Sequence, residues 1–453
     1  MSRSLLSRSS VRALRAGPQP LRLLSTEPTK QPPPTPAASS DSSHHDPPSS
    51  SHPPSAVSRS TSSSPSLSRL SPGPRPLPSA SQPPPIRYNP SVSSDFDHSF
   101  GTVLSHLPRQ FGANQRLTVP DETRKVLEDV VSTFEAPIRY AFAYGSGVFK
   151  QSGYDKKSSI EPPMLDFIFA VSHADHWHSI NMHQNPSHYP LAARLAGGSL
   201  VSRFQSISPG LWFNPYASVN GVTIKYGVIS VETLTSDLLT WKTLYSAGRM
   251  HKPVRIIKDD PRIRLTQQVN LASALRTALL MLPEEFTEKQ LFESIAWISY
   301  MGDPRMSGAV PLENRNKVAN IVEKQSDLFR ELYWKLASGI QGVHWQQGSS
   351  VVQQDNDPKV RVLRLRRLPV TLLQAIERHY ASQPSYSNLS SDEGVFWLTV
   401  ASDDTLTSVI QTELRQIVRG PSTVQSAKGV VTAGVGKSLR YGLTKVRKWW
   451  AGS

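Results

Sequence analysis

The chain has 453 residues and a formal net charge of +15. This length is enough for two or three domains. Cysteine is absent, which excludes disulfides, thiolate zinc sites and cysteine nucleophiles. The positive charge indicates acidic partners. Nucleic acid, nucleotides and anionic lipid all qualify, because charge alone does not choose among them.

The first 26 residues have the composition of a mitochondrial targeting sequence. They contain five arginines, several serines and scattered leucines, and the first acid of the chain is Glu27. Such a start is typical of a transit peptide, so we expect residues 1–26 to be one, with a disordered basic tail as the alternative. Residues 27–94 are dominated by Pro and Ser. We expect a disordered linker there, because too few large apolar side chains are present to offset the entropy lost on ordering.

Strand and helix patterns begin after about residue 95. In chain order, we first predict a helix over 121–135 and strands at about 138–144 and 164–171. A further helix is predicted to start near Asp175, with that residue as N-cap. One or two strands over 221–230 and a helix over 233–247 are predicted to follow. The mixture of helices and strands predicts an α/β (α+β) fold for residues 95–260.

The following part of the chain is predicted to be mainly helical. We expect helices ending at Pro283, over 286–299 and over 314–334, with a break at Gly302–Pro304, and short helices with loops over 360–420. Residues 261–420 are therefore expected to form a smaller α-helical domain.

The most informative stretch is the apolar segment 140–150, which ends in Gly145, Ser146 and Gly147, followed by the apolar segment 165–171, which carries Asp166. A turn of small residues lets backbone N–H groups approach a triphosphate. A carboxylate on the next strand can hold the Mg²⁺ that the phosphates need. An acid inside an apolar strand needs such a reason, because burying an unpaired charge is costly. The arrangement indicates a nucleotidyltransferase that uses Mg²⁺.

Each of these residues also has a structural interpretation. Asp166 would otherwise cap the turn after its strand, and Ser146 would be an ordinary turn serine. Lys150 follows the turn and is a candidate phosphate ligand, although exposed loop lysines are common. Lys225 lies in an apolar strand, where either phosphate binding or an ion pair with Asp166 or Glu232 would explain its charge.

Several further blocks resemble one family within the nucleotidyltransferase superfamily. Beside the Gly-Ser-Gly turn and the Asp166 strand, they are Asn185-Pro-Ser-His-Tyr189, Trp212-Phe-Asn-Pro-Tyr216, Ile224-Lys-Tyr-Gly-Val-Ile229 and the run from Trp241 to Val254. Together they are similar to the mitochondrial CDP-diacylglycerol synthase family, also called the translocator assembly and maintenance protein family. The resemblance covers roughly residues 95–345.

The resemblance implies an activity and a location. CTP and phosphatidic acid would give CDP-diacylglycerol and pyrophosphate at the matrix face of the mitochondrial inner membrane, and the product would feed cardiolipin synthesis. The fold implied is a nucleotidyltransferase mixed sheet with flanking helices. No nucleic acid is expected as a partner. The resemblance also implies that Trp177, His178, Asn181, Asn185 and Tyr189 form a wall beside the nucleotide.

The chemistry of this reaction suits the predicted site. A phosphate monoester is already ionised near neutral pH, so the main requirement is neutralisation of charge. Lys225 is a catalytic candidate beside Asp166. Arg249, His251 and Lys252 lie together after a predicted helix, where they would bind the lipid phosphate or pyrophosphate, or else form a solvated basic helix end.

The sequence departs from the superfamily pattern at the metal site. The residue two positions after Asp166 is Ile168, where the pattern has a second acid. Asp155, Glu161 and Glu232 are alternatives for a second ligand, or one carboxylate suffices with water and phosphate oxygens. Five histidines between 173 and 188 raise the question of zinc. Their spacing does not match a zinc-binding helix, and we do not expect zinc.

The C-terminal residues 421–453 are predicted to bind membranes. No acid follows Glu413, and a helical wheel separates apolar from basic residues. The residues that we expect to contact an anionic membrane are Lys437, Leu439, Arg440, Leu443, Val446, Trp449 and Trp450. Packing of this helix on its own domain is the alternative. No apolar run is long enough to span a bilayer, so we expect a soluble or peripheral protein.

Two other functions are compatible with parts of the pattern. An RNA-directed nucleotidyltransferase would explain the positive charge but not the terminal helix. A degenerate, non-catalytic nucleotidyltransferase acting as a scaffold of the import machinery would explain the missing second acid, but not the presence of both the Gly-Ser-Gly turn and Asp166.

Overall fold

The computed structural model describes residues 107–108, 110–149, 164–307, 316–387, 389 and 392–451, and for residues 307, 387, 431 and 433–451 it describes the backbone alone. All of them belong to one compact unit, residues 87–453. The expected transit peptide and linker lie outside the described residues, as do Lys150, Asp155 and Glu161. Those predictions therefore stay untested.

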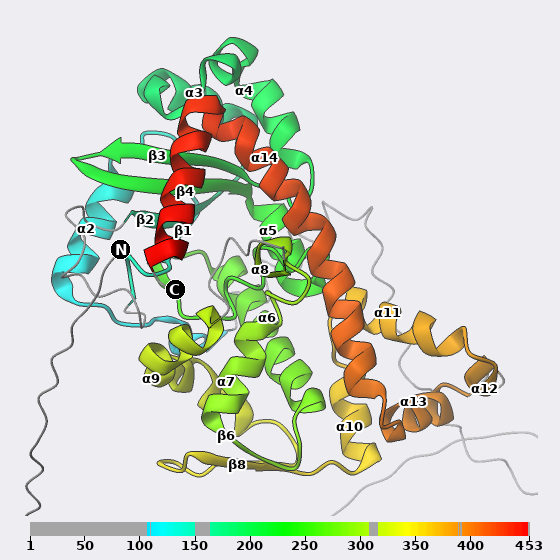
Figure 1. Cartoon of the computed structure of the whole chain (residues 1–453). Helices are drawn as coiled ribbons and strands as arrows, with labels where there is room; N and C mark the ends of the chain where they lie inside the picture. Colours follow the sequence, from blue (N-terminus) through cyan, green and yellow to red (C-terminus); the bar gives the residue numbers. More distant parts are fainter. Residues whose placement is uncertain are drawn as a thin grey trace, which may run out of the picture. The chain divides into compact units, whose positions relative to one another are not determined.

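A five-stranded mixed sheet forms the centre of the α/β part (Figure 1). Its strands, in spatial order, are β3 (Trp212–Val219), β4 (Val222–Ser230), β2 (Leu165–Val171), β1 (Tyr140–Tyr144) and β5 (Arg255–Lys258). β2 and β4 are parallel, and the other neighbours are antiparallel. The predicted α/β fold class is confirmed.

Both faces of this sheet are covered by helices, which is why its central strands are almost continuously apolar. On one face, Phe167 and Phe169 pack with side chains of α2 (Asp121–Ser132) and α3 (Ala174–Gln184). On the other face, Ile168 and Ala170 pack with α5 (Val231–Thr240) and α6 (Pro261–Met281). Because side chains alternate along a strand, Asp166 lies on the α5–α6 face.

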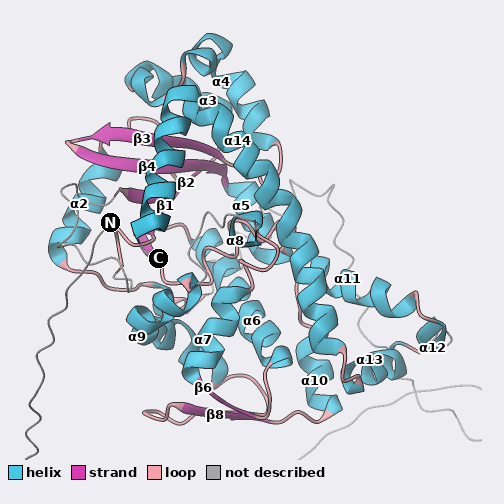
Figure 2. Ribbon diagram, in the orientation of Figure 1, coloured by secondary structure: helices cyan, strands magenta, loops and turns pink. Residues whose placement is uncertain are grey.

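Figure 2 shows that the rest of the described chain is mostly helical. Its elements are η1 (Ala113–Gln115), η3 (Pro186–His188), α4 (Leu191–Ser206), α7 (Glu288–Trp297), α8 (Pro304–Ser307), α9 (Lys317–Ala337), α10 (Pro358–Leu365), α11 (Val370–Ala381), α12 (Pro384–Ser387), α13 (Glu393–Ser402) and α14 (Leu406–Ala451). A small sheet of β6 (Glu285–Thr287), β8 (Val351–Gln354) and β7 (Val343–His344) accompanies them.

Local sequence signals explain where several of these helices begin. α7 starts with a capping box, in which the Thr287 hydroxyl accepts from the Gln290 N–H and the Gln290 side chain accepts from the Thr287 N–H. α6 starts with Asp260 as N-cap and Pro261 at the first helical position. Both helices agree with the predicted ones within a few residues.

The hydrophobic core does not stop at the predicted domain boundary. One cluster of buried side chains runs from Phe142 and Ile168 in the sheet, through Leu275 in α6, to Phe292 in α7 and Leu414 in α14. The α-helical region therefore packs directly against the face of the sheet that carries Asp166. The predicted division at residue 260 stays a prediction.

Two local predictions were wrong. The helix predicted over 233–247 ends at Thr240, because Trp241 takes a left-handed conformation with φ 57°, and so does Leu244 with φ 53°. Asp175 is not an N-cap. His173 occupies that position without a side-chain bond, and Asp175 lies in the first turn of α3.

The sequence patterns also missed several elements. β3 contains Pro215 and an irregular register against β4, which hides its alternation. α4 contains Gly197 and Gly198, which are unfavourable in a helix interior. The strands of the small sheet have two to four residues, too few for a periodic signal.

α14 covers the C-terminal segment in which a helix was predicted. Among the residues that the structure describes, no helix is long and apolar enough to cross a membrane. The side chains expected to contact lipid, from Lys437 to Trp450, lie outside the described side chains. Their role stays a prediction.

Candidate functional site

The Gly-Ser-Gly turn closes directly after β1. Gly145 has φ +87°, a conformation that favours glycine, and its carbonyl accepts from the N–H groups of Val148 at 3.1 Å and Phe149 at 3.0 Å. Ser146 is half-buried within the turn. The backbone is therefore folded tightly at the end of a central strand.

Gly147 is needed for a different reason. A Cβ atom at this position would lie 2.8 Å from Cδ2 of Leu165 and 3.0 Å from the carbonyl oxygen of Met164. The turn thus lies against the start of β2, and a larger residue would push the two apart. The two glycines hold the turn beside the strand that carries Asp166.

Asp166 lies next to the turn, as predicted. It is paired with Tyr144 in the β1–β2 register, and its Oδ2 lies 3.5 Å from the point that a Cβ on Gly145 would occupy. Its side chain is 27% exposed. The carboxylate is therefore reachable from solvent immediately above the turn.

Lys225 lies beside Asp166 on the neighbouring parallel strand. The two residues are register partners between β2 and β4, and Lys225 Nζ lies 3.7 Å from Asp166 Oδ1. Nζ also lies 4.7 Å from the ring centroid of Phe213. The ion pair that the sequence left open is present, at a distance near the limit for such a contact. The Lys225 side chain is 22% exposed, so the pair remains open to a ligand.

Tyr144 joins this group to a second set of cations. Burial, and then the negative charge of Asp166, raise the pKa of its hydroxyl above the usual value, which keeps it protonated. The guanidinium of Arg249 lies 6.0 Å from the Tyr144 ring and 3.8 Å from the Tyr245 ring. Arg249 therefore lies at the same edge of the sheet as Asp166.

Lys252 extends this basic cluster. Its ammonium group donates to the carbonyl of Gly248 and to the hydroxyl of Ser299, the latter at 2.7 Å, and it lies 5.0 Å from the Tyr300 ring. Lys317 lies 5.7 Å from the same ring. Burial, followed by the charges of Arg249 and Lys317, lowers the pKa of Lys252 well below its usual value. Cations crowded in this way favour the binding of an anion.

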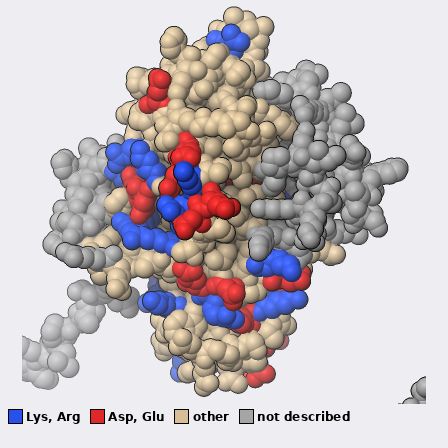
Figure 3. All heavy atoms as spheres, turned by 90° about the vertical axis from the view of Figure 1, so that its left-hand side faces the viewer, with Lys and Arg blue, Asp and Glu red and all other residues tan. Residues whose placement is uncertain are grey.

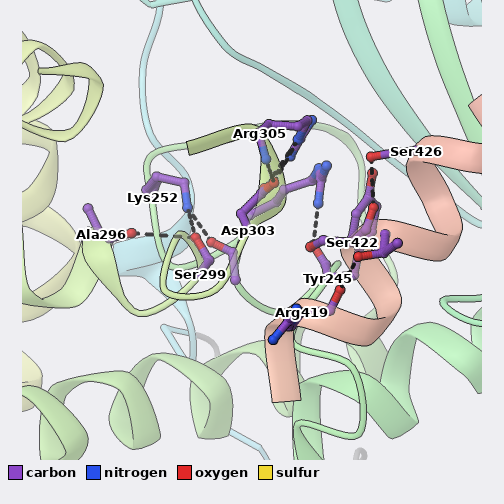
Figure 4. Close-up of polar contacts among 12 residues, drawn as sticks. Tyr245, Lys252, Ala296, Ser299, Asp303, Arg305, Arg419, Ser422 and Ser426 are labelled. Carbon is purple, nitrogen blue, oxygen red and sulfur yellow. Dashed lines mark hydrogen bonds and ion pairs between the residues drawn. The ribbon is translucent and has the colours of Figure 1, made fainter. Parts of the chain in front are cut away.

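An ion pair borders the cluster. Arg305 donates from Nε to Asp303 Oδ1 at 3.0 Å and from Nη2 to Oδ2 at 2.6 Å. Burial acts to raise the pKa of Asp303, but the two-pronged contact with Arg305 outweighs it and holds the pKa below the usual value. Figure 4 shows this pair near Lys252 and Tyr245, with Ser422 and Ser426 of α14 alongside.

His251 lies apart from Arg249 and Lys252, although it stands between them in sequence. Its ring is buried 5.2 Å from the Trp241 ring, with Nε2 3.0 Å from Asn270 Oδ1. Burial lowers its pKa to about 3, so it is neutral at physiological pH. The structure therefore does not bring His251 to the basic cluster of Arg249 and Lys252. We assign it instead to the packing beneath the loop.

Asp237 is a supporting residue that the sequence interpretation missed. Its carboxylate accepts from four backbone N–H groups, those of Thr243, Leu244, Ser246 and Ala247, at 2.8–3.0 Å. These bonds hold the non-helical loop that leads to Arg249 and Lys252. An aspartate near a helix end followed by Thr and Ser gave only a weak signal for such a loop.

Glu232 does not provide an evident second metal ligand. It is exposed in the first turn of α5. Across the described ranges, no three His, Asp or Glu side chains gather closely enough to hold a metal ion by themselves. Asp166 is the carboxylate that the structure brings to the turn.

The wall expected from Trp177, His178, Asn181 and Tyr189 lies on the wrong face for contact with a nucleotide at Asp166. Asn181 contacts the hydroxyl of Tyr226, which lies on the α2–α3 face, while His178 bonds to Tyr189 and Gln205. Asn185, the fifth member of the expected wall, donates to Asn181. Tyr226 accepts from Asn181 at 2.9 Å and from Asn214 at 2.8 Å, and it lies 2.9 Å from His188 Nδ1. The expectation is corrected, because alternation along β4 places Lys225 and Tyr226 on opposite faces.

Comparison with known proteins gives a consistent family. A sequence model of the family described as "Phosphatidate cytidylyltransferase, mitochondrial" matches residues 127–448. The protein of that name from Xenopus laevis is 40% identical over 321 residues, which cover 70% of this chain and 93% of the relative. The Saccharomyces cerevisiae protein is 43% identical over 252 residues, covering 55% and 64%. The Schizosaccharomyces pombe protein is 37% identical over 349 residues, covering 74% and 86%.

Proposed function

The chain belongs to the mitochondrial phosphatidate cytidylyltransferase family, and we propose that it transfers the cytidylyl group of CTP to phosphatidic acid. The products are CDP-diacylglycerol and pyrophosphate. The observation that carries this proposal is the gathering of the Gly-Ser-Gly turn, Asp166, Lys225 and the Arg249–Lys252 cluster at one edge of one sheet.

The proposed reaction is a displacement at phosphorus. A phosphate oxygen of phosphatidic acid attacks the α-phosphorus of CTP, a new P–O–P bond forms, and the bond to the β-phosphate breaks. The electron pair of that bond leaves with pyrophosphate. Because the attacking monoester is already ionised, the protein has to position two anions and neutralise their repulsion.

The basic residues suit this task from two sides. Lys225 lies next to Asp166 on the sheet, where it can contact the triphosphate above the turn. Arg249 and Lys252 lie on the loop held by Asp237, where they can contact the lipid phosphate or the leaving pyrophosphate. Backbone N–H groups of the turn add donors that do not have to reorganise during the reaction.

The residues present also fit a magnesium ion carried by the substrate. Mg²⁺ is usually held by one or two carboxylates together with phosphate oxygens and water, so one exposed carboxylate at the turn is sufficient. Asp166 would hold the ion, which when bound neutralises charge on the triphosphate. Lys225 at 3.7 Å would then pair less with Asp166 and more with the phosphates.

The lipid substrate and the mitochondrial family support a proposal for the site of action. We propose a peripheral protein on the matrix side of the mitochondrial inner membrane, where its product would enter cardiolipin synthesis. Residues 437–450 of α14 combine basic and apolar side chains in a way that suits anionic headgroups.

The direct test is an assay of the complete chain with CTP and phosphatidic acid, with and without Mg²⁺. We expect pyrophosphate and CDP-diacylglycerol in equal amounts, only when both substrates and the metal are present. Formation of product with RNA in place of phosphatidic acid would instead support an RNA-directed enzyme. Absence of turnover with either acceptor would support the scaffold.

A further inference from the structure

The second helix of the α3–α4 pair exposes large apolar side chains in an unusual concentration. Leu195 is 81% exposed, Leu191 63% and Leu200 53%, and Ile207 follows at the end of the helix. Single exposed leucines are ordinary, but several on one helix usually mark a contact with a partner or a membrane. The opposite side of α4 packs normally, with Ala193 and Val201 buried in a small cluster.

The backbone of α4 packs closely against α3 at one point. α4 bends at Gly197, which has φ 78° and ψ 169°. At the next position, a Cβ on Gly198 would lie 2.2 Å from Ser179 Oγ and 2.6 Å from the carbonyl oxygen of Asp175. α4 therefore approaches α3 more closely than a side chain would permit. The exposed leucines belong to a defined surface rather than to a loose end.

The charges that α4 itself carries are all positive, while an exposed acid, Asp175, lies in the first turn of the neighbouring helix α3. Residues 176–231 contain no Asp or Glu, whereas α4 itself carries Arg194 and Arg203, both exposed. Figure 3 shows few charged side chains at the end of the molecule where α3 and α4 lie, while both signs crowd its middle. A helix that exposes leucines and arginines and carries no acid of its own is complementary to an anionic bilayer surface.

The surface is also joined to the membrane-binding helix proposed above. The ammonium group of Lys428 in α14 donates to the carbonyls of Gln205 at 3.0 Å and Ile207 at 2.8 Å, at the end of α4. Lys428 is buried, and burial lowers its pKa to about 8. α14 is therefore fixed to the end of the helix that carries the leucines.

We propose that Leu191, Leu195 and Leu200 insert into the headgroup region of an anionic bilayer, with Arg194 and Arg203 contacting its phosphates. This surface gives the protein a second membrane contact besides α14. The inference rests on the proposed function, because an enzyme that takes a substrate from a bilayer must touch that bilayer. We call these five residues the α4 surface.

The absence of cysteine allows a direct test in the complete chain, since Leu195→Cys introduces the only thiol. That thiol is labelled with an environment-sensitive nitrobenzoxadiazole dye. Vesicles contain phosphatidylcholine with phosphatidylglycerol, which is anionic but is not the substrate, and CTP is omitted. The matched control is Leu363→Cys, at a leucine of α10 that is 43% exposed.

We expect the label at position 195 to brighten and shift to the blue with these vesicles, and the label at position 363 to stay unchanged. With pure phosphatidylcholine the response at position 195 should be much weaker. No response at 195 while the protein floats with the vesicles would overturn the proposal. An equal response at positions 195 and 363 would also overturn the proposal. A response at position 195 that depends on protein concentration and occurs without vesicles would overturn it in favour of self-association.

A second variant connects the surface to turnover. Gln keeps the helix propensity of Leu but not its apolar side chain, so Leu191→Gln/Leu195→Gln tests insertion without a helix breaker. We expect vesicle affinity to fall at least about tenfold, because each leucine contributes about that factor when buried. Turnover on vesicles should fall with it, while turnover on soluble short-chain phosphatidic acid should stay within about twofold.

The two proposals fail in different ways. Equal loss on vesicles and on the short-chain substrate would overturn the membrane role of these leucines and assign them to the fold or the active site. If the wild-type chain turns over neither substrate but the label at 195 still responds to vesicles, the cytidylyltransferase proposal fails and the α4 surface stands.

Discussion

The two faces of the central sheet carry two very different polar groups, only one residue apart along β4. On the α2–α3 face, the Tyr226 hydroxyl is buried with three partners at 2.8–2.9 Å, all from side chains of the protein. On the other face, Lys225 and Asp166 are partly exposed and lie 3.7 Å apart. A closed, satisfied network stabilises a fold, whereas an open and loosely paired one leaves its charges available to a ligand.

The exposure and pairing of a polar group indicate its function better than its residue type does. The closed group consists of His, Asn and Tyr side chains, and the open group of Asp, Lys, Arg and Tyr side chains, and all of these kinds occur in active sites. The side chains around the Tyr226 hydroxyl are buried and bonded to one another. The Asp166 edge has exposure, an adjacent turn and several cations. The predictions below test whether activity follows the open group and stability the closed one.

The largest expected effect is that of Asp166→Asn on turnover. Asn keeps the shape but loses the charge that would hold the metal, so we expect the rate to fall by about a hundredfold to a thousandfold or more. The thermal unfolding midpoint should change little, because the carboxylate is partly exposed. Pyrophosphate release and calorimetry measure the two quantities.

Glu232→Gln is the matched control for this variant, since it removes an exposed acid from the neighbouring helix α5. Its turnover should remain near that of the wild type. Near-normal activity of Asp166→Asn would remove Asp166 from the metal site and restore the scaffold interpretation.

A smaller effect is expected from the lowered pKa of Lys252. Because burial and neighbouring cations lower this pKa, the ammonium charge is lost as pH rises through the lowered value, and kcat/KM should fall on the alkaline side. Arginine stays charged there, so Lys252→Arg should move that decline to higher pH. The check is a pH profile of kcat/KM for both proteins.

Lys242→Arg is the control for the same loop, because Lys242 is exposed and lies outside the cluster. Its profile should coincide with that of the wild type. An unchanged profile for Lys252→Arg would show that Lys252 supports the loop rather than the anion.

On the closed face, Tyr226→Phe should act on stability. Removal of the hydroxyl takes an acceptor from the amides of Asn214 and Asn181 in a buried site, although Asn181 keeps its bond to the Tyr189 hydroxyl. We therefore expect a loss of about 1–3 kcal/mol in the free energy of unfolding. Turnover of the folded protein should be nearly unchanged. Urea denaturation and the same assay measure these effects.

Tyr144→Phe provides the reciprocal control, because it removes a hydroxyl from the open face beside Asp166. It should cost less stability than Tyr226→Phe. A loss of activity in Tyr226→Phe as large as that of Asp166→Asn would contradict the separation of the two faces.

The smallest expected effect is a pH dependence of stability from His178. Its ring lies between Tyr189 and Gln205, and burial lowers its pKa to about 4 from an unfolded value near 6.5. The unfolded chain therefore binds the proton more readily. The stability due to neutral His178 is complete above about pH 6.5 and is lost as pH falls from there towards 4.

Urea denaturation at several pH values between 7.5 and 5 checks this prediction, with His178→Gln reducing the decline. The control is His176→Gln on the same helix, whose ring is exposed. A decline that His176→Gln reduces as much as His178→Gln would assign the effect to surface charge.

Much of the α/β core could be predicted because its signals are local. The apolar runs of β1 and β2, the glycines between them and the acid in β2 can all be read from a few consecutive residues. β3 and α4 were missed because Pro215 and the pair Gly197–Gly198 interrupt the expected periodicity. The packing of α3 against α4, which makes Gly198 necessary, involves residues that no local window contains.

The candidate site likewise combines residues that local sequence signals predict with residues whose roles depend on long-range packing. Its turn and Asp166 were found from sequence, and Lys225 was found with its partner undecided. The separation of His251 from its neighbours was not foreseen, because adjacent residues in a loop can point in any direction. Asp237 was missed because a carboxylate that accepts backbone N–H groups leaves no characteristic spacing.

From the amino-acid order one can predict a small-residue turn, an acid and a basic segment, in this order, within an α/β fold. The parallel pairing of β2 and β4, which brings Lys225 to Asp166, and the placement of Tyr226 on the closed face are seen in the three-dimensional structure alone. Alternation along a strand fixes which side chains share a face. The pairing of strands far apart in sequence then fixes which of them meet.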